Sequence, residues 1–283
     1  MTSSLQGRTV IVTGGSMGIG YACAAAAHEA GANVVMAARG EAELINAADR
    51  LGPARVLAHT CDVSDESQVA DLFAAAASRF GALDGVVHAA AIVGPIGEIT
   101  GVAAEEWLGA VRVDLFGAFL VARAAARALQ PQRRGKIVLL SGGGATAPFP
   151  RYSAYACSKV GVVRLAETLA VELAPYRIDV NALAPGFVAT RIHQATLSAG
   201  PRAGADYLEQ TRAQLEAGGS PASLAADAAV FLLSSASDGI TGRLLAAAWD
   251  DWRAWPSRAE VIRGSDLFTL RRIVPRDRGM PWQ

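Results

Sequence analysis

The stretch "VIVTGGSMGIG", residues 10–20, passes directly from a predicted strand into a predicted helix that begins near Ile19. Gly14, Gly18 and Gly20 follow the spacing Gly-x-x-x-Gly-x-Gly, and glycine lets the backbone turn tightly and approach a ligand without a Cβ atom in the way. The helix would direct its free N–H groups and the positive end of its dipole at a pyrophosphate. The stretch lacks the Gly-Lys-Ser/Thr of nucleotide-hydrolysing loops, so it predicts dinucleotide binding at the first strand of an α/β domain.

Beyond this stretch, short apolar runs alternate with longer helical patterns such as residues 65–81 and 160–174. Strands that are apolar on both faces and separated by helices predict a parallel sheet covered on both sides. Right-handed crossovers then give a doubly wound α/β fold, which we expect to occupy residues 1–248 together with the catalytic site. The seven predicted strands are residues 8–15, 32–39, 54–63, 83–91, 136–143, 178–186 and 243–249.

The composition excludes several classes of function. The formal net charge of the 283 residues is zero and no long Lys/Arg run is present, so we expect no nucleic-acid partner. Every apolar run is interrupted by Arg or Asp and no signal peptide is evident, so we expect no membrane partner. The four histidines are isolated, so we expect no metal. Cys23, Cys61 and Cys157 are odd in number and widely spaced, which favours a reduced, cytoplasmic location.

A second motif, "YACSK", places Tyr155 four residues before Lys159 at the start of a predicted helix, so the two side chains share one face. A free tyrosine has a pKa near 10, but an adjacent ammonium group stabilises the phenolate and lowers that pKa. Tyr155 would then give a proton to a carbonyl oxygen or take one from an alcohol. Tyr152 is a rival candidate, but it lies seven residues from Lys159 and before the predicted helix, so we interpret it as a wall of the substrate pocket.

Together, "TGGSMGIG" and "YACSK" resemble the motifs of the short-chain dehydrogenase/reductase family, and the resemblance covers roughly residues 6–245. It implies a seven-stranded Rossmann-type fold, a nicotinamide cofactor, and a homodimer or homotetramer. It also implies that Asp62 contacts the adenine, that Ala89 and Ala90 line the cofactor, and that residues 185–190 embrace the nicotinamide. The cofactor-binding residues expected on this basis are Gly14, Ser16, Met17, Gly18, Ile19, Gly20, Arg39, Asp62, Val63, Ala89, Ala90, Tyr155, Lys159, Pro185, Gly186, Val188 and Thr190.

Two of these positions have further interpretations. The second predicted strand ends in Ala38 and Arg39, where a carboxylate would bind the ribose 2′-hydroxyl of NAD and repel a 2′-phosphate. A guanidinium suits a phosphate, so the sequence favours NADP over NAD, unless Arg39 is only a solvated surface residue. Met17 weakens this preference, because many NADP-dependent relatives carry a second basic residue in the glycine loop. Asp62 could also be a charge at the N-terminus of the following helix, because "DVSDES" caps that helix, and both roles can hold.

Three departures from the family pattern lie near the predicted site. The substrate-orienting serine of the family falls on Gly142, one residue after Ser141. We expect the glycines at 142–144 to swing Ser141 toward the substrate, although Thr146 or the glycine N–H groups are alternative donors. The asparagine of the family's proton relay falls on Asp114, whose charge would oppose the Tyr155 phenolate. The family's "NNAG" is "HAAA" at residues 88–91.

The sequence therefore predicts an NADP-dependent oxidoreductase that interconverts a small-molecule carbonyl or imine and the corresponding alcohol or amine. Its predicted catalytic residues are Tyr155, Lys159, Ser141 and Asp114. The departures leave open an alternative, a cofactor-binding sensor or assembly partner with an impaired site. We expect residues 94–97, 148–152 and 191–215 to form the substrate pocket.

Residues 249–283 form a Trp- and Arg-rich extension that we expect to pack on the domain or on a partner subunit, because Trp and Arg are common in interfaces. The side chains expected to be largely buried there are Trp249, Trp252, Trp255, Leu267, Phe268 and Leu270.

Overall fold

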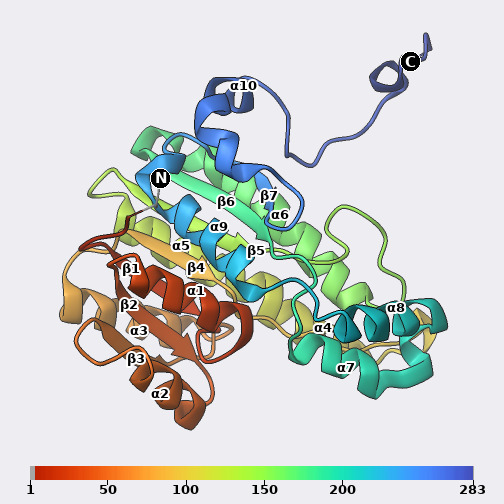
Figure 1. The fold of residues 1–283 in the computed structure, drawn as a ribbon, viewed down its shortest axis with the longest axis horizontal. Helices are drawn as coiled ribbons and strands as arrows, with labels where there is room; N and C mark the ends of the chain where they lie inside the picture. Colours follow the sequence, from red (N-terminus) through yellow and green to blue (C-terminus); the bar gives the residue numbers. More distant parts are fainter. Residues whose placement is uncertain (1–3, 283) are drawn as a thin grey trace.

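A computed structural model describes residues 4–282 and places seven parallel strands in one sheet (Figure 1). The strand order is β3-β2-β1-β4-β5-β6-β7, which confirms the predicted seven-stranded doubly wound fold. The order reverses direction between β1 and β4, and ligands of such sheets bind at this switch point, beyond the carboxyl ends of the strands. The strands are β1 Thr9–Thr13, β2 Asn33–Ala38, β3 Val56–Thr60, β4 Gly85–His88, β5 Gly135–Leu140, β6 Ile178–Ala184 and β7 Leu244–Ala246.

Two hydrophobic layers cover the sheet, because alternate residues of each strand point to opposite faces. Val10 and Val12 of β1 pack with α1 and α9, whereas Ile11 between them packs with α3, α5 and α6. The helices are α1 Gly18–Glu29, α2 Glu41–Asp49, α3 Glu66–Phe80, α4 Ala104–Val111, α5 Gly117–Leu129, α6 Ser153–Leu173, α7 Arg191–Ala199, α8 Ala205–Glu216, α9 Ala222–Leu233 and α10 Ala259–Arg263.

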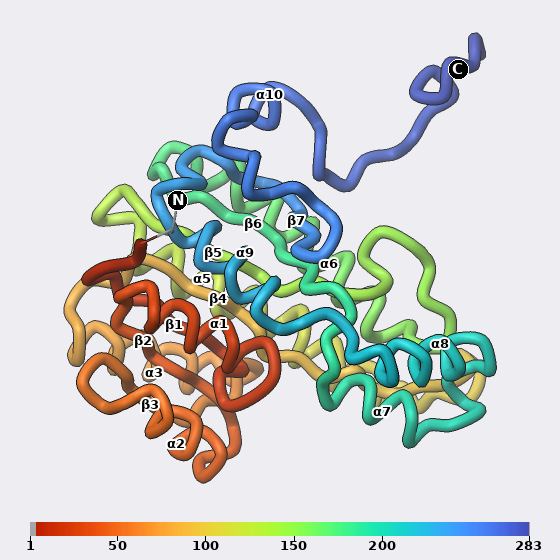
Figure 2. The backbone as a smooth tube through the Cα atoms, in the orientation of Figure 1, coloured from red at the N-terminus to blue at the C-terminus, as the bar shows by residue number. Residues whose placement is uncertain are grey.

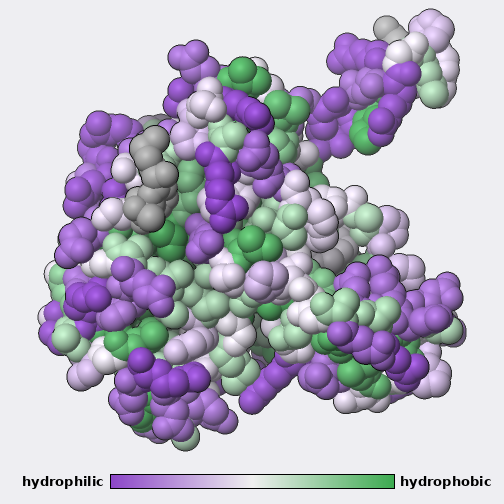
Figure 3. All heavy atoms as spheres, in the orientation of Figure 1, coloured by the Kyte–Doolittle hydropathy of each residue, from purple (hydrophilic) through white to green (hydrophobic). Residues whose placement is uncertain are grey.

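Helices α7 and α8 form an arm beside the sheet, reached from the carboxyl end of β6 (Figure 1). The outer surface of this arm is mostly hydrophilic (Figure 3). Within residues 4–282, no helix is both long and apolar enough to cross a membrane.

The extension after β7 follows the domain surface and then leaves it (Figure 2). Trp252 and Trp255 are buried in the core layer of α1 and α9, as predicted. Trp249 is 74% exposed and Leu267 47% exposed, so the domain itself does not bury these two side chains, contrary to the prediction for the domain. Their burial by a partner subunit stays a prediction.

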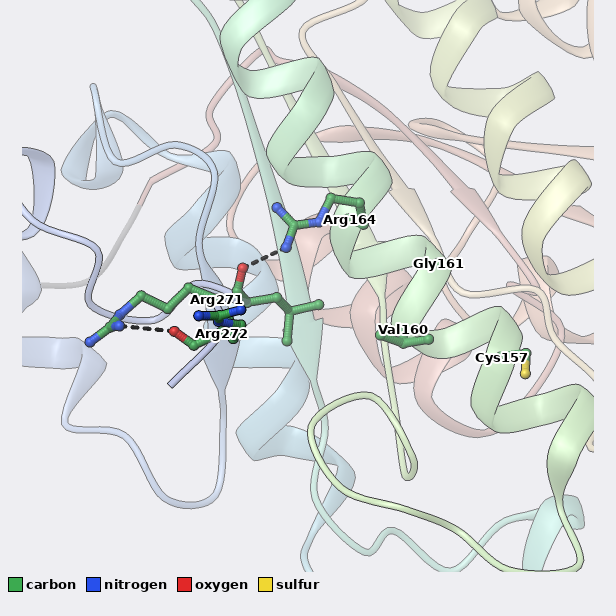
Figure 4. A pocket seen from close by; sticks show the side chains of 7 residues that line it. Cys157, Val160, Gly161, Arg164, Arg271 and Arg272 are labelled. Carbon is green, nitrogen blue, oxygen red and sulfur yellow. Dashed lines mark hydrogen bonds between the residues drawn. The ribbon is translucent and has the colours of Figure 1, made fainter. Parts of the chain in front are cut away.

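Hydrogen bonds fix the extension as far as Leu270. Its N–H donates to Glu167 Oε1 at 2.6 Å, and its carbonyl oxygen accepts from Arg164 of α6. Figure 4 shows Arg164 reaching across to the extension beside a shallow pocket between α6 and residues 270–272. The extension is therefore attached along the outer side of the helix that carries Tyr155 and Lys159.

Candidate active site

The glycine loop between β1 and α1 fits a pyrophosphate because side chains are excluded from it. A Cβ atom on Gly14, whose φ is +66°, would lie 2.8 Å from the backbone nitrogen of Ala90. A Cβ atom on Gly20 would lie 2.1 Å from the Gly14 carbonyl oxygen, a distance no real contact allows. Met17, the N-cap of α1, offers no side-chain hydrogen bond to the helix, so the first N–H groups of α1 stay available to a ligand.

Two aspartates, Asp62 and Asp65, lie just before α3 and have different roles. Asp65 is the N-cap of α3 and accepts from the N–H groups of Ser67 and Gln68. Asp62 instead accepts from the Ser64 N–H at 2.9 Å and from the Ser64 hydroxyl at 2.8 Å. The stretch "DVSDES" thus caps α3 through Asp65, whereas the Asp62 carboxylate holds the turn that follows β3. Its predicted contact with adenine stays a prediction.

At the end of β2, Arg39 is exposed beside the glycine loop. The structure adds an acidic neighbour that the sequence analysis did not identify. A Cβ atom on Gly40 would lie 2.6 Å from Glu43 Oε2, so the Glu43 carboxylate folds back over the residue next to Arg39. The position expected to face the ribose 2′-group therefore carries one positive and one negative side chain.

The segment after β6 lies opposite the glycine loop. Gly186 has a φ of +85°, and a Cβ atom there would lie 2.9 Å from the side chain of Ala248. Thr190 is the N-cap of α7, and its methyl group lies 3.4 Å from the Cβ position of Gly18. The structure thus brings residues 185–190 toward the glycine loop, as expected for two walls of one cofactor cleft.

Tyr155 and Lys159 lie in the first turns of α6 and both are buried. Lys159 Nζ lies 5.3 Å from the centre of the Tyr155 ring and donates to the Leu140 carbonyl oxygen at 3.2 Å. Burial raises the pKa of the Tyr155 hydroxyl, and the charge of Asp114 adds to the increase. Without a ligand, the protein therefore holds Tyr155 as a neutral phenol, the form that donates a proton.

Asp114 lies in a π-helical turn, Arg112–Phe116, between α4 and α5. Its Oδ1 accepts from the Ile92 N–H at 2.8 Å, and its Oδ2 lies 3.7 Å from Lys159 Nζ without a hydrogen bond to any described residue. Burial raises the pKa of Asp114 and lowers that of Lys159, and the attraction between the two groups opposes both changes. The Asp114 carboxyl group is thus a buried titratable group directly beside the predicted catalytic lysine.

Asp114→Asn is expected to shift the pH–rate profile of alcohol oxidation to lower pH. The carboxylate raises the pKa of both Tyr155 and Lys159, so its removal lowers both. Oxidation needs a phenolate beside an ammonium group, and the pH range in which both exist would move down. Turnover of an alcohol measured across pH tests this, with the exposed Asp227→Asn as control. An unchanged or raised midpoint would show that the Asp114 charge does not act on the pair.

His88, the first residue of "HAAA", is buried at the end of β4. Its Nδ1 lies 2.9 Å from the Thr13 hydroxyl, whereas its Nε2 makes no hydrogen bond within residues 4–282. Burial and the Lys159 charge lower the pKa of His88 to about 3, so the ring is neutral at physiological pH. It links the ends of β1 and β4 beneath the site.

The structure contradicts the predicted role of Ser141. The Ser141 hydroxyl donates to the Lys159 carbonyl oxygen at 3.4 Å, on the body of α6, and does not face Tyr155. Gly142 faces Tyr155 instead, since a Cβ atom there would lie 2.5 Å from the tyrosine hydroxyl oxygen. Extended backbone turns successive side chains to opposite sides, and the glycines do not reverse this. Thr146, the other hydroxyl considered, is exposed.

An aromatic cluster lies over Tyr155. Phe149 stacks on Tyr152 at 4.3 Å between ring centres, and Tyr207 of α8 meets both rings edge-on. The Tyr152 hydroxyl donates to the Thr196 hydroxyl at 2.9 Å, so its proton is already held in a hydrogen bond within the protein. Sequence analysis placed residue 207 in the pocket segment but did not single out its ring. The apolar side chains that join the cluster are Val93, Ile96, Ile192, Ala195, Ala199 and Ala203, and they come from or directly adjoin the three predicted pocket segments.

Comparisons with known proteins agree with this geometry. The family model described as "Enoyl-(Acyl carrier protein) reductase" matches residues 14–247. The short chain dehydrogenase/reductase dpchG of Colletotrichum higginsianum is 34% identical over 216 residues, 74% of this chain and 80% of the relative. The 3beta-hydroxysteroid dehydrogenase 1 of Eggerthella lenta is 37% identical over 253 residues, 87% of this chain and 94% of the relative. A solved structure, a variant of actinorhodin polyketide ketoreductase with NADPH, has a TM-score of 0.78 at 27% identity and covers 84% of this chain and 95% of its own.

Proposed function

The chain belongs to the short-chain dehydrogenase/reductase family of oxidoreductases, and on this premise we propose that it interconverts an apolar ketone and its alcohol with NADP. The observation that carries the proposal is the Tyr155–Lys159 pair, buried under an aromatic cluster and beside a glycine cradle for a dinucleotide. When bound, the nicotinamide supplies or accepts the hydride. An imine and its amine would use the same groups.

In the proposed reduction, the Tyr155 hydroxyl donates its proton to the substrate oxygen as hydride reaches the carbonyl carbon. The Lys159 ammonium stabilises the phenolate that this leaves, and a proton from solvent restores the hydroxyl. Stabilisation of the phenolate by Lys159 is required because burial and Asp114 both raise the pKa of Tyr155. The aromatic rings over Tyr155 keep water away from the reacting carbon.

The pocket lining supports an apolar substrate. Apart from Tyr155 itself, the polar atoms contributed by its rings are the hydroxyls of Tyr152, which is bonded to Thr196, and Tyr207. A substrate surface that packs on these rings gains more if it is apolar, because a hydroxyl placed against them would lose a hydrogen-bond partner. The 3beta-hydroxysteroid dehydrogenase relative, by its name, acts on a bulky apolar alcohol, in keeping with this proposal.

A panel of ketones tests the proposed function. Oxidation of NADPH, followed by its absorbance, is expected with alicyclic and aromatic ketones and not with keto sugars of similar size. The alternative, a cofactor-binding protein without turnover, predicts NADPH binding but no oxidation with any ketone. The departures at Gly142 and Asp114 motivate that alternative, and the retained Tyr155 and Lys159 argue against it.

Arg39→Ala is expected to weaken NADPH binding about tenfold, the scale of one charge-assisted hydrogen bond, and to leave NADH binding unchanged. Glu43→Gln removes the acid that folds back beside Arg39, so it should strengthen NADPH binding. Titration of cofactor fluorescence gives both dissociation constants. Equal affinities for NADPH and NADH in the unaltered protein would refute the preference for NADP.

We also infer a homodimer or homotetramer. Large apolar side chains are exposed along α5, α6 and the turn before α5, among them Phe116 at 44%, Phe119 at 39% and Val171 at 77%. A second copy of the chain could cover them, and the mass of the protein in solution tests this. The unpaired cysteines agree with the proposed cytoplasmic location.

A further inference from the structure

The Tyr155 hydroxyl lies against bare backbone. Because a Cβ atom on Gly142 would lie only 2.5 Å from the hydroxyl oxygen, the ring occupies space that a side chain at residue 142 would fill. A substrate oxygen that accepts the Tyr155 proton must therefore come close to the backbone of Gly142. The Ser141 hydroxyl is not placed to donate to that oxygen, since it faces α6, and Thr146 is exposed to solvent.

The direction of the Gly142 N–H follows from the strand before it. In a parallel strand, the N–H and C=O groups of successive residues point alternately to the two neighbouring strands. The Ser141 N–H donates to Leu183 of β6 at 2.8 Å, so residues 140 and 142 direct theirs to the opposite side, toward β4. Lys136 agrees, because its N–H donates to Asp84, the residue before β4, and residue 142 lies an even number of positions from it.

On that side no strand extends far enough to pair with the Gly142 N–H. β4 ends at His88, and no residue in the described part of the chain accepts from the N–H of Gly142. A partly buried N–H that is left without a protein acceptor at a catalytic tyrosine is placed to bind a ligand oxygen.

We propose that the backbone N–H of Gly142 stabilises the substrate oxygen, in the place of the missing serine hydroxyl. The inference rests on the proposed function. As hydride forms the new C–H bond, the π electron pair of the carbonyl moves to oxygen, which takes the Tyr155 proton. The Gly142 N–H donates to this oxygen while its negative charge develops, as backbone donors do in oxyanion holes.

The test deletes this N–H without adding atoms. Glycolic acid in place of Gly142, introduced by in vitro translation, replaces the amide with an ester. With NADPH and a ketone that the unaltered protein reduces, kcat is expected to fall at least about tenfold while KM and NADPH affinity change little, because the bond strengthens only in the transition state. The control is the same ester at Gly52, between α2 and β3, whose N–H donates to the carbonyl oxygens of Ala48 and Asp49, and it should leave kcat unchanged.

The outcomes separate this proposal from the proposed function. Full turnover in the Gly142 ester variant would overturn the N–H donor while leaving the oxidoreductase intact. A loss in Ser141→Ala that matches the expected ester effect, with normal turnover in the ester variant, would assign the role to the serine hydroxyl instead. If the unaltered protein reduces no ketone at all, the proposed function fails and this inference falls with it.

Discussion

Tyr155→Phe is expected to lower turnover at least about a hundredfold, the usual scale for a lost general acid–base group. The substitution keeps the buried ring, its edge contact with Phe149 and its packing under the pocket, and it removes only the hydroxyl that faces Gly142. NADPH affinity should therefore survive. Steady-state reduction of a ketone and cofactor fluorescence measure the two quantities separately.

The neighbouring ring provides the control for this prediction. Tyr152→Phe also removes one phenolic hydroxyl, but that hydroxyl is bonded to Thr196, and burial raises its pKa to about 12. Its loss should reduce turnover far less than the loss of Tyr155. The opposite order would move the proton transfer to Tyr152. Equal and complete losses with impaired NADPH binding would indicate damage to the pocket rather than lost chemistry.

Much of the fold could be predicted because its signals are local. Runs such as residues 136–143 are apolar on both faces, as a covered parallel sheet requires. Six of the seven predicted runs contain their strand, and β5 begins at Gly135, one residue before its predicted run. Gly14 and Gly20 are required at this spacing because the two residues lie in close contact where β1 leads into α1. A short sequence motif therefore reveals this contact. The Tyr155–Lys159 pair was equally accessible, since both residues lie on one helix face.

The parts that could not be predicted depend on contacts between distant residues or on one step of register. Ser141 and Gly142 differ by one position, and which of them faces Tyr155 depends on how the end of β5 lies against α6. Tyr207 joins the site from an arm whose path the sequence does not specify. Glu43 reaches back to Gly40 through a side-chain conformation that no spacing rule indicates.

The burial of the tryptophans in the extension could not be predicted either, because nothing in the sequence distinguishes the buried ones from the exposed ones. Trp255 is 2% exposed and its ring lies 4.6 Å from that of Phe268, between ring centres, whereas Trp249 projects into solvent. Arg243 secures the same region by donating to the carbonyl oxygens of Ile262 and Leu267. The first part of the extension thus completes a hydrophobic layer of the sheet.

This layer is connected to the candidate cofactor cleft. The Ala247 N–H donates to the Ala184 carbonyl oxygen at 2.9 Å, at the start of the segment expected to embrace the nicotinamide. Ala248 lies against Gly186 of the same segment, as the Cβ distance above shows. A loss of packing around Trp252 or Trp255 would therefore disturb residues only a few positions from those that contact the cofactor segment.

Trp255→Ala is accordingly expected to lower the free energy of unfolding by about 3–5 kcal/mol, the usual cost of deleting a buried tryptophan ring. In a chain of this size that corresponds to a fall in melting temperature of roughly 10 °C, which calorimetry would measure. Trp249→Ala removes the same ring from an exposed position, so it should change stability by no more than about 0.5 kcal/mol. If the two variants melted together, the extension would not be part of the folded core, and the link between Trp255 and the cofactor cleft would be lost with it.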